Sequence, residues 1–364
     1  SFDSVDDVLS DISRGKMVIV TDDEARENEG DLVMAASKVT PEAINHMIIH
    51  GRGLICAPLL PNQLGRLGIS SMVPHNREAQ KTDFTVSVDA ADGITTGISA
   101  FDRASTIKIL SSPSAMPEDL VQPGHVFPLR ARPGGVLERA GHTEAAVDLS
   151  TLAGLHPSGV ICEILKEDGT MARLPDLKKL KKKWGIKMLS IASLIEYRHK
   201  REKLIKEFSV SEFSHNLGKF RLHTFRSILD ERIHYVLSFG KWTKNKIPMI
   251  RVQTANVVSD VLGYSSKAGS RNSVNDSLSA IVSHGCGALL YLEPRRNDSQ
   301  ESGSKSSYDS PKLPVMDFRD YGIGAQILAA LGISKLVLLS RDRRRVIGLE
   351  GYGLEIIKHV TLPS

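Results

Sequence analysis

The sequence predicts an α/β protein: an N-terminal α+β sandwich built on a mixed sheet, followed by a second, smaller α/β domain. Two observations support this. Short β-branched runs alternate with amphipathic segments over the first two hundred residues, a pattern typical of strands covered by helices. The 364 residues also exceed what one hydrophobic core usually supports. We therefore expect one domain over residues 1–208 and another over 209–364.

Four apolar runs in the first domain have the length and composition of strands. They are "MVIV" (17–20), "GLICAPL" (53–59), "TVSVDA" (85–90) and "GVICEIL" (159–165). We also expect three helices, over residues 40–51, 102–111 and 191–208. The first has Thr40 as a cap, Pro41 at the first helical position and Gly51 at its end, which is the usual punctuation of a helix.

The apolar rhythm restarts at "LGKFRLHTF" (217–225), which indicates the second domain. Within it, "SQESGSKSSYDS" (299–310) has six serines in twelve residues and is predicted to be a mobile loop. The following "DYGIGAQILAALGISKLVLLS" (320–340) is predicted to form a helix and then a strand.

Charge and cysteine content exclude several classes of protein. Three cysteines in 364 residues are too few for a disulfide framework, and no apolar stretch is long enough to cross a bilayer. The net charge of +5 comes largely from three basic clusters, over 177–187, 197–206 and 341–345. We interpret "LKKLKKKWGIK" (177–187) as a solvated helix face and expect no nucleic-acid partner. The chain begins without methionine, so we expect that an upstream segment, such as a targeting peptide, has been removed.

The segment "TDDEARENEGD" (21–31) places six carboxylates directly after the apolar run "MVIV". A solvated turn is the ordinary interpretation of such a cluster. Two other polar stretches also lie at the ends of predicted elements, "QPGHVFPLRARPGG" (122–135) with His125 and "RAGHTEAAVDL" (139–149) with His142. Glu163 lies inside an apolar strand, where a carboxylate needs a partner or a metal unless the strand is half exposed.

Together these residue types favour one chemistry. Carboxylates, an imidazole and water form the ligand shell that Mg²⁺ or Mn²⁺ prefers, whereas a thiolate-rich zinc site has no candidate ligands here. Such a cation binds hydroxyl and carbonyl oxygens and stabilises an enediolate. Arg26 and Arg139 stand next to the candidate ligands and could hold a phosphate. The sequence therefore points to a sugar phosphate as substrate.

Four segments resemble 3,4-dihydroxy-2-butanone-4-phosphate synthase over roughly residues 1–205. They are "DDEARENEGDLVMAA", "TTGISAFDRA", "QPGHVFPLRARPGGVLERAGHTEAAVDL" and "GVICEILKEDGTMAR". The resemblance implies conversion of D-ribulose 5-phosphate to formate and L-3,4-dihydroxy-2-butanone 4-phosphate, with two Mg²⁺ or Mn²⁺ ions, in riboflavin biosynthesis. It also implies a homodimer whose active site is completed across the subunit interface.

Matched position by position, the resemblance assigns roles to individual residues. Glu27 and His142 become metal ligands, and His125 and Glu163 become the groups that move protons. Residues that match substrate-contacting or site-lining positions of the family are Arg26, Glu27, Asp31, Arg139, Ala140, Gly141, His142, Thr143 and Glu163 for the substrate, with Asp22, Glu29 and Cys56 in support. The implied reaction begins with proton abstraction next to a carbonyl, and the residue that takes the first proton stays open.

The second half is similar to GTP cyclohydrolase II over about residues 209–364, through "SHGCGALLYLEPRR" and "DFRDYGIGAQILAALGISKLVLLS". That enzyme binds zinc through three cysteines. Asn256, Lys267 and Gly269 stand at the matching positions, and an ammonium such as that of Lys267 cannot ligate a cation. The nucleotide loop is altered to "EPRRNDSQE" (293–301), although Asp317 and Arg319 still match a catalytic pair. We therefore expect a folded domain without zinc that is inactive toward GTP.

Three alternatives remain beside a synthase with a degenerate partner domain. They are a bifunctional enzyme that keeps GTP hydrolysis, a non-catalytic pathway scaffold, and a basic nucleic-acid binder. Fused proteins of this kind occur in bacteria and in plant plastids. The absent start methionine and the decay of one half favour a plastid over a bacterial cytoplasm.

Overall fold

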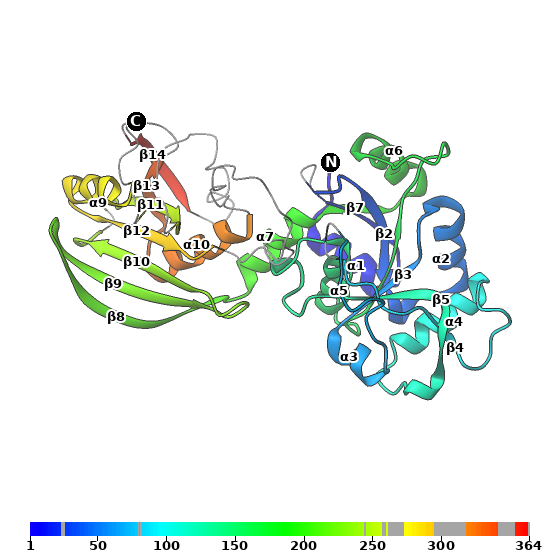
Figure 1. Cartoon of the computed structure of the whole chain (residues 1–364). Coiled ribbons are helices and arrows are strands. Elements are labelled where there is room, and N and C mark those ends of the chain that lie inside the picture. Colours follow the sequence, from blue (N-terminus) through cyan, green and yellow to red (C-terminus); the bar gives the residue numbers. More distant parts are fainter. Residues whose placement is uncertain are drawn as a thin grey trace, which may run out of the picture. The chain divides into compact units, whose positions relative to one another are not determined.

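The structure is a computed structural model. In it the chain forms two compact units, Ser1–Tyr197 and Arg198–Ser364. In Figure 1 each unit is a sheet flanked by helices. The described residues are 1–22, 26–78, 80, 82–243, 245–256, 260, 273–294, 318–340 and 354–362. Each unit is described by itself. The predicted α/β class with mixed sheets is confirmed for both units.

The first unit contains a seven-stranded sheet in the order β4-β5-β3-β6-β2-β1-β7. Its strands are β1 (Val18–Thr21), β2 (Gly30–Ala35), β3 (Cys56–Leu59), β4 (Val88–Ala90), β5 (Leu120–Arg130), β6 (Gly159–Glu163) and β7 (Lys187–Ser190). The β1–β7 and β3–β5 pairs are parallel and the other pairs are antiparallel. The sheet is therefore mixed, as predicted.

Helices cover both faces of this sheet (Figure 1). The helices of the unit are α1 (Val5–Ser13), α2 (Pro41–His46), α3 (Pro61–Arg66), α4 (Ala100–Leu110), α5 (His142–Leu152), α6 (Leu174–Trp184) and α7 (Ile191–Arg201). Ile19 and Leu32 pack with Ile44 of α2 and Ile107 of α4 in one core cluster, while α5 and α1 contact each other and β1 and β2. Because both faces of the sheet are covered there, β1, β2 and β3 are buried at every position rather than alternately.

The predicted helix over 40–51 is confirmed as α2 and the π-helical turn Met47–Gly51 that continues it. Thr40 Oγ1 caps it by accepting from Ala43 N at 3.2 Å. The helix predicted over 191–208 is wrong at its C-terminal end, because α7 ends at Arg201 and β8 begins at Ile205. The alternation of apolar and polar residues in "EFSVSEF" has the period of a strand, and pairing with β9 selects that state.

The second unit contains a second seven-stranded sheet, in the order β14-β13-β11-β12-β10-β9-β8. Its elements are β8 (Ile205–His215), β9 (Gly218–Ser227), β10 (Ile233–Phe239), β11 (Met249–Thr254), α9 (Ser273–His284), β12 (Gly287–Leu292), α10 (Phe318–Ala330), β13 (Lys335–Ser340) and β14 (Glu355–Thr361). Strands β8 to β10 and β12 pair antiparallel, and β11 to β14 pair parallel. The predicted helix and strand over 320–340 are confirmed as α10 and β13.

Other sequence predictions are confirmed or lie outside the described residues. Helix α6 carries the lysine cluster and buries only Leu177, as expected of a solvated helix. The serine-rich segment 299–310 lies outside the described residues. Among the helices that the structure describes, none combines the length and the apolar character that a membrane crossing requires.

Phe225 of β9 tests the core of the second unit. Its side chain is fully buried, so we expect Phe225→Ala to lower the free energy of unfolding of this unit by about 3–5 kcal/mol through lost burial and a cavity. Chemical denaturation followed by fluorescence measures the change. Phe208→Ala is the matched control, since Phe208 is 48% exposed and its ring makes one exposed contact with Arg226; it should cost less than about 1 kcal/mol. Equal losses in the two variants would contradict the assigned core.

Candidate active site

Two carboxylates lie opposite each other on the paired strands β2 and β6, at one end of the strands of the first sheet. Asp31 of β2 is the ladder partner of Glu163 of β6. Opposed residues on paired strands point to the same side of a sheet, so these acids share the face on which α5 packs. Glu163 Oε2 accepts from the backbone N of Leu54 at 2.8 Å, which fixes one oxygen. Because an added Cβ on Gly53 would lie 2.5 Å from this same oxygen, only glycine permits this approach.

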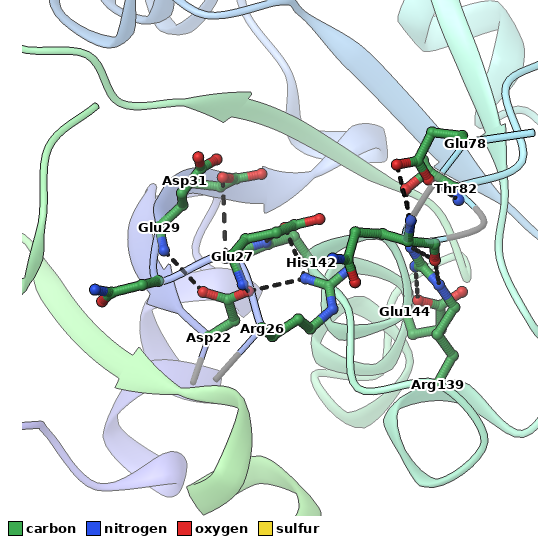
Figure 2. Close-up of polar contacts among 12 residues, drawn as sticks. Asp22, Arg26, Glu27, Glu29, Asp31, Glu78, Thr82, Arg139, His142 and Glu144 are labelled. Atoms are coloured by element: carbon green, nitrogen blue, oxygen red, sulfur yellow. Dashed lines mark hydrogen bonds and ion pairs between the residues drawn. The ribbon is translucent and has the colours of Figure 1, made fainter. Parts of the chain in front are cut away.

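The predicted acidic segment forms a loop organised by Asp22. Asp22 Oδ2 accepts from Arg26 Nη1 at 2.9 Å and from Glu27 N at 3.1 Å. Its Oδ1 accepts from Glu29 N at 2.8 Å. One side chain thus ties together the start and the end of the loop (Figure 2). Residues 23–25, which include Asp23 and Glu24, lie outside the described residues.

His142 reaches the same place from the first residue of α5, which is buried along most of its length. Its Nδ1 lies 3.7 Å from Glu27 Oε2, and its Nε2 lies 3.9 Å from Asp31 Oδ1. Figure 2 shows Asp22, Arg26, Glu27 and Asp31 gathered around this imidazole. Residues separated by more than a hundred positions in the sequence therefore form one cluster.

The cluster contains a candidate metal centre. One potential ligand atom from each of Asp22, Glu27 and His142 lies within 4.8 Å of the other two. Among the described residues, two buried atoms beside it, Asp31 Oδ1 and His142 Nε2, have no hydrogen-bond partner. Carboxylate oxygens with one imidazole suit Mg²⁺ or Mn²⁺, and orphaned buried atoms are usually satisfied by an ion or water. The residues present therefore fit a divalent cation, with Asp22 added to the predicted pair of ligands.

Burial and neighbouring charges shift the pKa values of this cluster. Burial raises the pKa of Asp31 to about 7, and the carboxylates of Glu163 and Glu27 add to the rise. Burial alone would lower the pKa of His142, but the neighbouring Asp31 and Glu27 outweigh it and raise the value to about 9. Burial and the charge of Glu27 raise the pKa of Glu29. A cluster that concentrates carboxylates in this way attracts a cation.

His125 of β5 pairs with a residue that sequence reasoning did not identify. Its Nδ1 lies 2.7 Å from Asp89 Oδ2, and its backbone N donates to Asp89 Oδ1 at 2.9 Å. An ionised carboxylate only accepts hydrogen bonds, so Asp89 holds the proton on Nδ1 and leaves Nε2 as the acceptor. The signal for Asp89 was its place near the end of the predicted strand "TVSVDA".

The predicted phosphate-binding residues already have protein partners. Arg26 Nη1 donates to Glu27 Oε2 at 2.7 Å as well as to Asp22. Arg139 donates to Glu144 Oε2 at 2.7 Å and to Thr82 Oγ1 at 2.8 Å, a second group in Figure 2. Glu144 is buried and was not predicted. The approach of Arg139 to Glu144 depends on Gly141, where an added Cβ would lie 2.4 Å from Arg139 Nη1.

The remaining predicted site residues lie nearby. Thr143 is buried in the first turn of α5, and Ala140 is partly buried just before that helix. Cys56 opens β3 opposite Ile161 of β6, and burial, reinforced by Glu163, raises the pKa of its thiol well above the usual range. A neutral thiol here lines the site rather than acting as a thiolate nucleophile.

Residues 6–197 match the family of 3,4-dihydroxy-2-butanone 4-phosphate synthases, and residues 206–361 match the family of GTP cyclohydrolase II. The riboflavin biosynthesis protein RibBA of Aquifex aeolicus is 46% identical, over 99% of this chain and 92% of that protein. The chain belongs to the RibBA family. Another relative is the chloroplastic bifunctional riboflavin biosynthesis protein RIBA 1 of Arabidopsis thaliana, which is 42% identical over 100% of this chain and 69% of that protein.

Two solved structures of similar proteins extend this family assignment. One is RibBX of A. baumannii, described as a two-domain 3,4-dihydroxy-2-butanone 4-phosphate synthase. Its alignment with this protein covers 100% of each chain, with 38% sequence identity and a TM-score of 0.79. A 3,4-dihydroxy-2-butanone 4-phosphate synthase in complex with two magnesium ions covers 55% of this chain and 98% of its own, with 43% identity and a TM-score of 0.53. RibBA relatives come from bacteria and from chloroplasts at similar identity, so a plastid location stays a prediction.

The RibBA match establishes that a GTP cyclohydrolase II domain is present. Its altered cysteine positions lie mostly outside the described residues, since 261–272 is not described and only Asn256 of the three is. Asp317 and residues 295–301 and 341–345 are also outside, and the side chain of Arg319 is not described. Cys286, the one cysteine of this unit in the sequence, is buried before β12, and burial raises the pKa of its thiol.

Asp89→Asn tests the arrangement around His125. The new amide can donate to Nδ1, so we expect the imidazole to change from the Nδ1–H to the Nε2–H tautomer, as ¹⁵N NMR of the ring nitrogens would show. Turnover should fall about 100- to 10,000-fold, the range for a misplaced acid–base histidine. Asp92→Asn, an exposed acid three residues away, is the charge-matched control and should leave both readouts unchanged. An unaltered tautomer in Asp89→Asn would show that Asp89 does not set it.

Proposed function

We propose that the first domain converts D-ribulose 5-phosphate to L-3,4-dihydroxy-2-butanone 4-phosphate and formate for riboflavin biosynthesis. The observation that carries this proposal is the convergence of Asp22, Glu27 and His142 beside the buried Asp31 Oδ1, which accepts no hydrogen bond from the described residues. These side chains lie in the part of the chain that matches the synthase family. The proposed homodimer rests on the family resemblance.

Asp22, Glu27 and His142 are the residues that would hold Mg²⁺ or Mn²⁺, and the magnesium-bound relative supports this choice of cation. When bound, such a cation polarises a carbonyl oxygen and stabilises the negative charge of an enediolate. Two ions and the use of Mn²⁺ are part of the proposal. The buried carboxylates and the imidazole then orient the substrate in a site from which bulk water is largely excluded.

Proton transfer is assigned to Glu163 and His125. Glu163 keeps one oxygen bonded to Leu54 N and its other oxygen available, so it can accept a proton without changing its position. His125 presents Nε2 because Asp89 occupies Nδ1, and its imidazole is 44% exposed. Glu163 is fixed at the end of the sheet and His125 is open to solvent. One of these two groups can therefore accept a proton from the substrate while the other donates a proton to it.

The phosphate is assigned to Arg26 and the segment 139–143. The Arg139 guanidinium and the backbone N–H groups in the first turn of α5, where no side chain caps the helix, are groups that attract an anion. The bonds that Arg139 makes to Glu144 and Thr82 hold its guanidinium at this position rather than free in solvent. The groups that would hold the phosphate therefore lie next to the candidate metal ligands, since Arg26 bonds Asp22 and Glu27.

Glu27→Ala tests the synthase assignment. We expect formate release from ribulose 5-phosphate with Mg²⁺ to fall more than about 100-fold, because changes outside the ligand shell already cost about 10- to 100-fold. Formate is measured by coupling to a formate dehydrogenase. Glu118→Ala removes an exposed carboxylate of the same domain and should keep full turnover. Full turnover in Glu27→Ala would remove Glu27 from the site.

Two observations on the second domain point in opposite directions. The RIBA relatives carry bifunctional names across the whole alignment, which favours retained GTP cyclohydrolase II activity and gives this alternative the stronger support from comparison. Asn256, Lys267 and Gly269 stand where that enzyme family needs cysteines, and the sequence offers only Cys286 in this domain. We propose on this chemistry that zinc-dependent GTP hydrolysis is lost, because an amide, an ammonium and a glycine cannot replace three thiolates.

The proposed loss is tested with one preparation of the full chain. Incubated with GTP and Zn²⁺, the protein should consume no GTP above a protein-free blank, and it should bind far less than one zinc per chain by elemental analysis. Formate production from ribulose 5-phosphate by the same preparation is the control for folded protein. GTP consumption at a rate comparable with the synthase reaction would establish the bifunctional alternative.

A further inference from the structure

Arg173 connects helix α6 to the acidic loop, the segment between β1 and β2 that carries Asp22 and Glu27. It immediately precedes α6, and its Nη1 donates to the backbone carbonyl of Glu27 at 2.6 Å and to that of Asn28 at 2.5 Å. The same nitrogen lies 3.8 Å from Glu29 Oε1. A single guanidinium nitrogen thus holds two consecutive carbonyls of the loop that carries the candidate metal ligand Glu27.

The backbone of this loop has an unfavourable conformation that a restraint from outside the loop can hold in place. Asn28 has a φ of 55°, in the left-handed region that non-glycine residues rarely adopt. From the β1 side, Asp22 fixes the loop through the N–H groups of Glu27 and Glu29. These bonds leave the carbonyls of Glu27 and Asn28 to be held from outside the loop, and Arg173 supplies that contact. The backbone at Glu27 is therefore fixed from both sides.

Arg173 is itself held by the helix that follows it. Its backbone N donates to Asp176 Oδ2 at 3.2 Å, in the first turn of α6. Leu177, one turn into the helix, packs onto the start of β2, where a Cβ added to Gly30 would lie 2.4 Å from Leu177 Cδ1. The first turn of α6 thus sits in a fixed position against the strand that carries Asp31.

We propose that Arg173 is a positioning residue for the metal centre, holding the loop backbone so that Glu27 points toward His142. This inference rests on the proposed function, since it concerns the same site. Arg173 touches neither His142 nor the carboxylate of Glu27 in any contact of the described residues. It acts through the carbonyls of the loop.

Positioning and charge predict opposite signs for the effect of removing Arg173. Its guanidinium is a positive charge close to the loop acids, so on electrostatics alone its removal would tighten the binding of a divalent cation. If its role is to position Glu27, removal weakens binding in spite of that gain. The direction of the change in cation affinity therefore separates the two roles.

The experiment is a titration of the full chain with Mn²⁺, in which free Mn²⁺ is measured by electron paramagnetic resonance. We expect Arg173→Met to bind Mn²⁺ about 10-fold or more weakly than wild type, within the range for residues that orient metal ligands. Arg173→Lys, which can reach one carbonyl with one ammonium, should fall between them. The Mg²⁺ concentration for half-maximal turnover should rise in parallel, with kcat at saturating Mg²⁺ changed less than about 3-fold.

Arg66→Met is the matched control. Arg66 also donates from its guanidinium to a backbone carbonyl of the same domain, that of Ser112 at 2.9 Å, but on α3. It should change neither Mn²⁺ affinity nor half-saturation by Mg²⁺. Unchanged or tighter Mn²⁺ binding in a folded Arg173→Met would overturn the inference, and should that variant fail to fold, unchanged binding in Arg173→Lys would do so. Absence of Mn²⁺ binding in wild type would instead contradict the proposed function itself.

Discussion

The first domain depends on one electrostatic constraint, the burial of Asp31 opposite a second, half-buried carboxylate at the end of its sheet. Asp31 is 2% exposed and faces Glu163 across the ladder. Two acids in this position repel each other and lose hydration, a cost that proteins tolerate when a cation or a proton compensates it. His142 supplies part of the compensation from α5. The convergence of Asp22 and Glu27 on the same imidazole provides ligands for a cation that would compensate the rest.

The architecture explains why these groups can be held so closely. The sheet is buried on both faces, so its strands cannot slip or twist to relieve the repulsion without exposing apolar residues. The candidate site residues are then carried on or next to adjacent strands in the order β5, β3, β6, β2 and β1. Glycines at 53 and 141 allow side chains to approach the backbone at two of these points. Strands β2 and β6 therefore fix Asp31 and Glu163, and the loop between β1 and β2 carries the candidate ligands Asp22 and Glu27.

Sequence reasoning singled out candidate residues that have unusual neighbours in the sequence, and it passed over two residues that contact them. Glu163 stood out as a carboxylate in an apolar strand, and His142 as an imidazole at a helix start; both lie in the cluster. Asp89 and Arg173 did not stand out, because an acid near the end of a strand and an arginine before a helix are common. Strand order and register decide their contacts, and neither can be read from local periodicity. The same limit explains why the helix over 191–208 was predicted too long: the pairing of β8 with β9 is not local.

In the second domain, the residues that build the apolar core differ from the residues that a zinc-dependent reaction would need. Its core is built by aliphatic and aromatic residues of the sheet and of α9, such as Phe220, Leu278 and Leu289. Asn256, Lys267 and Gly269, which the resemblance matches to the zinc-binding cysteines, are not among these residues, so a change of residue type at those positions removes none of these apolar contacts. Hydrophobic burial tolerates such losses because it depends on area and volume rather than on particular polar atoms. A metal site, by contrast, fails when one ligand is replaced, since ligation needs a particular donor at a particular place. Retention of this fold in the chain therefore carries no information about hydrolysis of GTP, and the identity of residues 256, 267 and 269 does.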